Sequence, residues 1–162
     1  MYVPFEQMPP SARIWIYQSD RPFEEQEKTW IISKLVGFCN QWNTHGVSMP
    51  TSFEIKHNQF VIMAVDESKG GASGCSIDSS IRVLREIENE LQLNLLDSGK
   101  ISYFGKDKIK VAMFPEIKKH IQEGELQAES KVFNPSVNKK ADLDKDWVVP
   151  ANQSWLKRYF TA

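Results

Sequence analysis

The chain has 162 residues, of which 41% are hydrophobic and 25% charged, and its 20 basic and 21 acidic residues leave a formal net charge of −1. This balance argues against nucleic acid or an anionic membrane as the partner, and no apolar run is long enough to cross a bilayer. The length suits one hydrophobic core, so we expect one cytoplasmic domain over residues 1–162, with an irregular lead-in at 1–11 and a C-terminal extension at 125–162 packed on the core.

Apolar spacing predicts alternating strands and helices in the first half of the chain. In order, these are a strand at 12–18, a helix that follows Asp20 and continues to about residue 42, a strand at 52–56 and a strand at 60–65. We expect Asp20 to be the N-cap of the helix, with Pro22 in its first turn. Cys39 falls on the apolar stripe of this helix and is interpreted as a small buried residue. The continuous apolar run at 60–65 predicts a central strand covered on both faces.

The second half contains fewer apolar residues. It predicts a helix over 77–91 with Ser76 as its N-cap, strands at 100–104 and 108–113 joined as a hairpin, a short helix between Pro115 and Gly124, and a final turn at 155–160. The segment between the short helix and Trp147 is polar and rich in charge. Within it, the run at 138–146 alternates in sign and is interpreted as a solvated loop. His57 in a turn and His120 on the short helix are both interpreted as facing solvent.

The order of these elements is that of a split βαβ, so we predict an α+β fold, a ferredoxin-like sandwich with an extra hairpin strand and a C-terminal extension. A doubly wound α/β sheet is the competing interpretation. The link between the strands at 52–56 and 60–65 has only three residues, and such a link cannot join parallel strands. In the favoured arrangement, the connections at 43–51 and 66–76 leave from the same edge of the sheet.

The most informative stretch is a glycine-rich loop that runs into the second long helix, residues 70–80. A helix start stabilises an anion or a thiolate, so Cys75 is a candidate nucleophile, with His45 as its base and Asp66 or Glu67 orienting the ring. The same loop is a candidate anion site, whose ligand-binding residues would be Gly71, Ser73, Gly74, Ser76 and Ser79. The alternative stays open that Cys75 only fills a crowded turn and that the glycines supply turn geometry.

Several familiar site types do not fit this loop. It has no lysine after its last glycine, as a P-loop requires, and Cys75 to Arg82 is one residue longer than the spacing of a phosphatase loop. A metal site formed by His45, Asp66 and Cys75 has no short-range ligand pair to support it. We therefore expect no metal and no cofactor.

Residues 1–5, 13–18 and 73–80 resemble an uncharacterised family of small bacterial proteins that are often labelled "ABC transporter ATPase". The resemblance spans most of the chain and implies no particular activity. An ABC ATPase needs a Walker A loop, a Walker B acidic residue and a signature segment, and only residues 60–66 resemble one of these.

The leading hypothesis is a small cytoplasmic protein with a pocket for an anion or another small ligand at residues 70–80, in which Cys75 is a candidate nucleophile. The alternative is a non-catalytic interaction or scaffold protein. It would self-associate as a homo-oligomer or bind a protein partner through the predicted hairpin, the tryptophan-bearing tail or a sheet edge. The sequence leaves open whether the protein is an enzyme.

Overall fold

The computed structural model describes residues 1–44, 47–68 and 74–161. The chain divides into two compact units, each described by itself: a first unit of residues 1–96 and 138–141, and a second unit of residues 97–137 and 142–162. Each unit combines helices with antiparallel strands, so the predicted α+β class is confirmed. The single domain over residues 1–162 stays a prediction.

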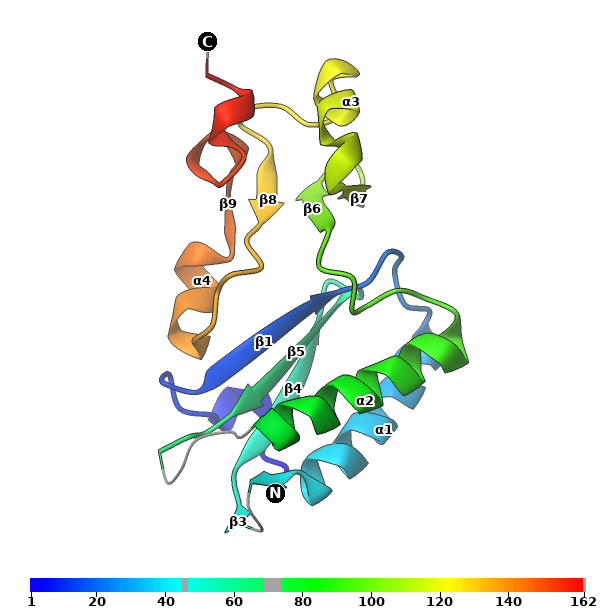
Figure 1. Ribbon diagram of the computed structural model, residues 1–162, viewed down its shortest axis with the longest axis vertical. Coiled ribbons are helices and arrows are strands. Elements are labelled where there is room, and N and C mark those ends of the chain that lie inside the picture. The colour runs from blue at the N-terminus through cyan, green and yellow to red at the C-terminus, as the bar shows by residue number, and fades with distance from the viewer. Residues whose placement is uncertain (45–46, 69–73, 162) are drawn as a thin grey trace. The chain divides into compact units, whose positions relative to one another are not determined.

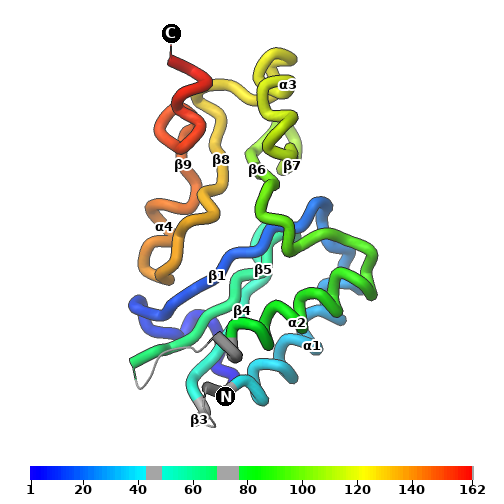
Figure 2. Tube along the Cα trace, in the orientation of Figure 1, coloured from blue at the N-terminus to red at the C-terminus, as the bar shows by residue number. Residues whose placement is uncertain are grey.

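The first unit is built on a three-stranded antiparallel sheet in the order β1-β5-β4. Its elements are β1 (Arg13–Gln18), α1 (Glu25–Gln41), β2 (Asn43–Thr44), β3 (Val47–Ser48), β4 (Thr51–Lys56), β5 (Phe60–Val65) and α2 (Gly74–Leu91). The helices α1 and α2 lie side by side on one face of this sheet (Figure 1). The same neighbourhood of α1 and α2 is visible along the Cα trace in Figure 2.

The central strand β5 is buried on both faces, as its apolar run predicts. All six of its residues have an exposed fraction of 0%. Alternate residues, among them Val61 and Met63, join the core that the apolar stripes of the two helices form with the sheet. Cys39 of α1 is part of the same core, and burial raises the pKa of its thiol to about 11. Its interpretation as a small buried residue is confirmed.

The sheet order reproduces three strands of the predicted split βαβ. The first predicted strand pairs antiparallel with the third, and the third with the second. The fourth expected strand, β6 (Lys100–Phe104), pairs instead with β7 (Ile109–Met113) and β8 (Lys131–Phe133) in the sheet of the second unit. Periodicity reveals that a strand has a buried face, but it does not reveal which sheet the strand joins.

The start of α1 differs from the prediction. Its N-cap is Glu24, whose carboxylate accepts a hydrogen bond from the backbone of Glu27, while the Glu27 carboxylate accepts from the Glu24 N–H at 2.9 Å. The prediction that Asp20 is the N-cap is therefore wrong. Asp20 instead exchanges two hydrogen bonds with Asn94, beyond the end of α2. Ser76 is likewise no N-cap, because α2 begins two residues before it.

Arg21 links the beginning of α1 to the end of α2. Its guanidinium donates two 2.8 Å hydrogen bonds to the Glu27 carboxylate and a third, also of 2.8 Å, to the carbonyl of Leu91. The bond from Arg21 and the backbone N–H of Glu24 lower the pKa of Glu27 from 4.5 to about 2. The carboxylate is thus held in its charged form in the folded protein.

A short segment from late in the chain completes the first unit. This returning segment (residues 138–141) pairs with the backbone at the beginning of β1. The ammonium group of Lys140 donates to the carbonyls of Phe5 at 2.8 Å and Met8 at 2.6 Å. These carbonyls belong to the irregular lead-in, which Lys140 therefore fixes to the rest of the unit.

The second unit contains a four-stranded antiparallel sheet in the order β7-β6-β8-β9. Its remaining elements are α3 (Ile117–Gln122), α4 (Leu143–Asp146) and β9 (Val148–Pro150). The predicted hairpin and the predicted short helix are both confirmed. The strands β8 and β9 are missing from the sequence-based prediction because each has only three residues, too few to show an alternating pattern.

Candidate functional site

The two connections that the sequence places at one sheet edge do meet there along the backbone. Thr51, which begins β4, is the register partner of Val65, which ends β5. The N–H of Asp66 donates to the carbonyl of Pro50 at 3.0 Å. The short strand β2, at the start of the connection 43–51, also lies near α2. The split βαβ topology therefore correctly predicted the proximity of these segments.

Only some of the residues predicted to act at this edge are among those that the structure describes. Three predicted site residues lie outside the described residues: His45, Gly71 and Ser73. The backbone of Gly74, Cys75 and Ser76 forms the first turn of α2, and Ser79 is half-buried one turn later. Asp66 accepts a hydrogen bond from the N–H of Ser68 at 3.0 Å, which closes a local turn. The meeting of Cys75 with His45, and its role as a nucleophile, stay predictions.

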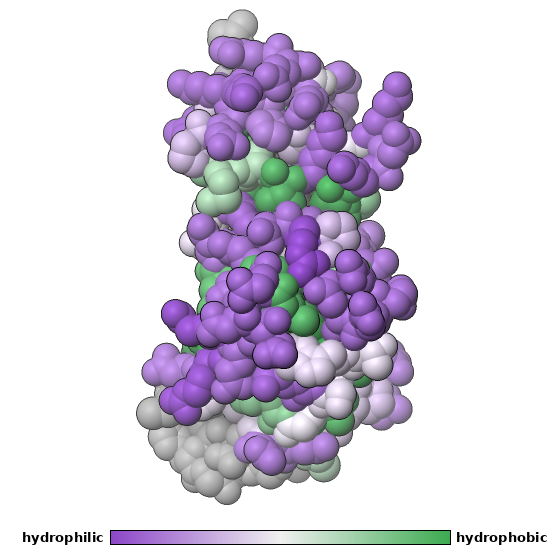
Figure 3. Space-filling view, turned by 90° about the vertical axis from the view of Figure 1, so that its right-hand side faces the viewer, coloured by the Kyte–Doolittle hydropathy of each residue, from purple (hydrophilic) through white to green (hydrophobic). Residues whose placement is uncertain are grey.

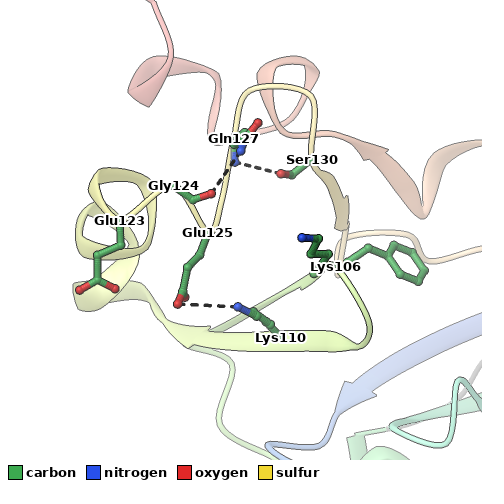
Figure 4. A pocket seen from close by; sticks show the side chains of 9 residues that line it. Lys106, Lys110, Glu123, Gly124, Glu125, Gln127 and Ser130 are labelled. Carbon is green, nitrogen blue, oxygen red and sulfur yellow. Dashed lines mark hydrogen bonds and ion pairs between the residues drawn. The ribbon is translucent and has the colours of Figure 1, made fainter.

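A second candidate site lies in the second unit, at a cavity of about 540 Å³ between the β6–β7 hairpin and the segment after α3 (Figure 4). Polar and charged side chains form most of its wall. The lining residues on which its chemistry depends are Gly105, Lys106, Lys110, Glu125, Gln127 and Ser130. A concave site with a few converging polar groups is the usual form of a small-molecule site.

The hairpin wall depends on the turn between β6 and β7. The N–H of Gly105 donates to the carbonyl of Lys108 at 2.8 Å, which closes the turn. A Cβ atom at Gly105 would lie 2.9 Å from that carbonyl, so a larger residue would force the turn open. The turn carries Lys106 at its tip and directs β7 back along the wall of the cavity.

The opposite wall is set by the end of α3. Gly124 has a φ of +75°, the left-handed conformation that commonly ends a helix. The N–H groups of Glu125 and Leu126 then donate to the carbonyl of His120 at 3.0 and 3.2 Å. Because Leu126 is anchored in the apolar core of the second unit, Glu125 is held beside the His120 ring.

Four side chains form a connected polar network along this wall. The Tyr103 hydroxyl lies 2.6 Å from His120 Nδ1, and Glu125 Oε2 lies 3.3 Å from the same nitrogen. Glu125 Oε1 lies 3.7 Å from the ammonium nitrogen of Lys110. Tyr103 and Lys110 are register partners on β6 and β7, so their side chains share a face of the sheet. Glu125 thus connects a lysine of the cavity wall to a histidine behind it.

The network fixes where its protons lie. An ionised carboxylate can only accept hydrogen bonds, so Glu125 favours a proton on His120 Nδ1. Burial, followed by the negative charge of Glu125, raises the pKa of the Tyr103 hydroxyl to about 12. Tyr103 therefore stays protonated at neutral pH.

The charges inside the cavity do not cancel. Lys110 is paired with Glu125, whereas Lys106 forms no ion pair with any side chain in the described parts of the chain. Glu123 also borders the cavity, but its carboxylate points away from the other lining side chains in Figure 4. As far as the described residues show, the positive charge of Lys106 is therefore available to a ligand.

No sequence pattern pointed to His120 as part of this site. The interpretation of His120 as a solvent-facing residue is wrong, because its side chain is only 17% exposed and contacts Tyr103 and Glu125. Gly124 was recognised as the end of the short helix. A left-handed residue there turns the chain back on the last turn of the helix, and this reversal brings His120 and Glu125 together.

Within residues 1–44, 47–68 and 74–161, no group of three or more His, Cys, Asp or Glu side chains is placed to hold a metal ion. None of the helices in the described ranges has the length and apolar character needed to span a membrane. No protein-family model matches the sequence, and comparisons with curated proteins and with solved structures found no significant similarity.

Proposed function

We propose that the protein binds a small anionic ligand in the cavity of the second unit, with Lys106 as its main contact. The observation that supports this proposal is that the Lys106 ammonium group, beside the cavity, has no ion-pair partner among the described residues, whereas Lys110 faces Glu125. The Ser130 hydroxyl accepts a hydrogen bond from the Gln127 N–H at 2.9 Å, which leaves its own proton to donate to a ligand. The ligand is thus an anion, as expected from the sequence, but its proposed site is the cavity of the second unit and not the loop at residues 70–80.

The character of the wall limits the class of ligand. A volume of about 540 Å³ is that of a site for a small molecule, and the lining is more polar than is usual for an apolar ligand. Ammonium and hydroxyl donors suit the oxygens of a carboxylate, sulfate or phosphate group. A water-soluble organic acid or phosphate ester is therefore the class that this site favours.

The first test removes the ammonium group of Lys106. We expect Lys106→Ser to weaken the binding of sulfate about tenfold or more, because a hydrogen bond to a charged group contributes about 1.5 to 3 kcal/mol. Titration with sodium sulfate at constant ionic strength, followed by amide chemical shifts, measures the affinity. Lys108→Ser is the matched control, since Lys108 lies in the same hairpin and does not border the cavity. Equal losses in the two variants would contradict a specific site.

The second test removes the competing carboxylate. In Glu125→Gln the side chain keeps its shape but loses the charge that faces Lys110 at 3.7 Å. We expect sulfate to bind about fivefold more tightly, equivalent to about 1 kcal/mol for one charge in a partly solvated site. The same titration measures this gain. A loss of affinity would instead mean that the Glu125 carboxylate itself contacts the ligand or holds the cavity open.

Two other functions remain proposals with less support. The anion site at residues 70–80, with Cys75 as a nucleophile, is supported by the start of α2 at Gly74 and by the shared sheet edge. A scaffold role is supported by Phe114 and Trp155, each 42% exposed. These aromatic residues are separate in the chain, and the face in Figure 3 is mostly hydrophilic, with hydrophobic areas interrupted by polar side chains. Isolated exposed aromatics are common in monomeric proteins.

A further inference from the structure

We infer that the cavity binds its anion together with one proton, which is held on His120; this coupling rests on the proposed function. The ligand is then taken up as the equivalent of a complete acid, an anion plus a proton. The structural basis is the position of Glu125, which faces a cation of the cavity wall with one oxygen and the His120 ring with the other.

Glu125 is the only described link between the two parts of the network, since it lines the cavity and also contacts His120. While His120 is neutral, the Glu125 charge is balanced mainly by Lys110. When His120 gains a proton, an imidazolium 3.3 Å from Glu125 Oε2 provides a second counter-charge. Lys110 is then released, in part, to face an anion in the cavity.

The other charged groups near His120 do not cancel this effect. The Tyr103 hydroxyl, which faces the ring from β6, stays neutral because its pKa is raised to about 12. Lys110 acts from β7 through its ion pair with Glu125. Glu123 lies in the segment that follows α3, and its carboxylate points away from the other lining side chains (Figure 4). Lys119, the neighbour of His120 on α3, is exposed. One proton on His120 therefore adds a positive charge to a site that already favours anions.

The direction of the pH dependence follows from linkage. The protonated form of His120 attracts the anion more strongly, so affinity rises as the pH falls through the range in which histidines titrate. The coupling is reciprocal, and a bound anion makes His120 keep its proton to higher pH. We expect an effect of about five- to tenfold on the dissociation constant, within the range of typical coupling between two sites.

Sulfate is the probe of choice, because it keeps its full charge between about pH 5.5 and about pH 8.5, on either side of the histidine titration range. Amide chemical shifts of the hairpin give the dissociation constant at both pH values. The wild-type protein is expected to bind about five- to tenfold more tightly at the lower pH. His120→Gln is expected to bind at both pH values with equal affinity. His57→Gln is the matched control and is expected to keep the pH dependence, since His57 lies in an exposed turn of the first unit.

The ring signals of His120 provide a second measurement that needs no variant at the site. Their titration midpoint in the wild-type protein is expected to move to higher pH when sulfate is added. Absence of sulfate binding at both pH values would overturn the proposed function. Sulfate binding that depends on Lys106 but is equal at both pH values would overturn only the coupling. A pH dependence that persists in His120→Gln, or a midpoint that sulfate does not move, would also overturn it.

Discussion

Replacing Leu35 with alanine is expected to lower the free energy of unfolding of the first unit by about 3 kcal/mol. Leu35 is 0% exposed and lies in the core between α1, α2 and the sheet, together with Ile31 and Leu84. Alanine would remove the transfer free energy of the lost methyl and methylene groups and leave a cavity, because neighbours on three rigid elements cannot all move inward. The loss is large because Leu35 is fully buried in this core.

Urea denaturation followed by far-UV circular dichroism measures the change. The matched control is Ile32→Ala on the next residue of the same helix, where the side chain is 42% exposed. We expect the control to change the free energy of unfolding by less than about 1 kcal/mol, because surface substitutions away from special features have small effects. Comparable destabilisation by the two variants would show that α1 does not present Leu35 to the sheet.

Removing the charge of Glu27 is the second change that we expect to lower the free energy of unfolding substantially. Its two 2.8 Å hydrogen bonds from Arg21 hold the pKa of Glu27 near 2, compared with 4.5 in the ordinary state. Arg21 is partly exposed, so solvent screening reduces the contribution to about 1 to 2 kcal/mol. Glu27→Gln is expected to destabilise the protein by this amount at neutral pH, since the amide cannot form the same charged pair with Arg21.

The acid dependence of this term has a defined sign. The folded state holds Glu27 ionised to lower pH than the unfolded state does, so the stabilisation is complete above 4.5 and is lost as the pH falls to about 2. The stability difference between wild type and Glu27→Gln should therefore shrink over this window. Glu25→Gln is the control, because Glu25 lies in the same first turn but is 83% exposed. A difference that is constant from neutral pH to about pH 2 would exclude the proposed ionic origin.

Local patterns were sufficient to predict most of the first unit. The run at 60–65 predicted a doubly covered strand because six consecutive apolar residues leave no face for water. The three-residue link before it fixed the antiparallel pairing of β4 with β5 and, with it, the shared edge at Asp66. Such predictions succeed because they depend on a few neighbouring residues.

Pairings between distant segments were the part that the sequence could not supply. Residues 100–104 were correctly predicted as a strand, but their partners in β8 lie about thirty residues further on, in a segment that is polar and rich in charge. The network of the candidate site also depends on contacts between distant segments, since Tyr103 lies on β6 and His120 on α3. No local pattern marks a histidine that meets a tyrosine only after a sheet has formed. The site at residues 70–80 could be predicted because its glycines and its cysteine are close together in the chain.

The returning segment has a consequence for how the protein is made on the ribosome. Because synthesis proceeds from the N-terminus, residues 1–96 emerge well before residues 138–141, which the first unit needs for its completion. Until then the carbonyls of Phe5 and Met8 have no ammonium group from Lys140. The nascent first unit therefore stays unfinished while residues 97–137 are translated, although its first 96 residues are made before any residue of the second unit.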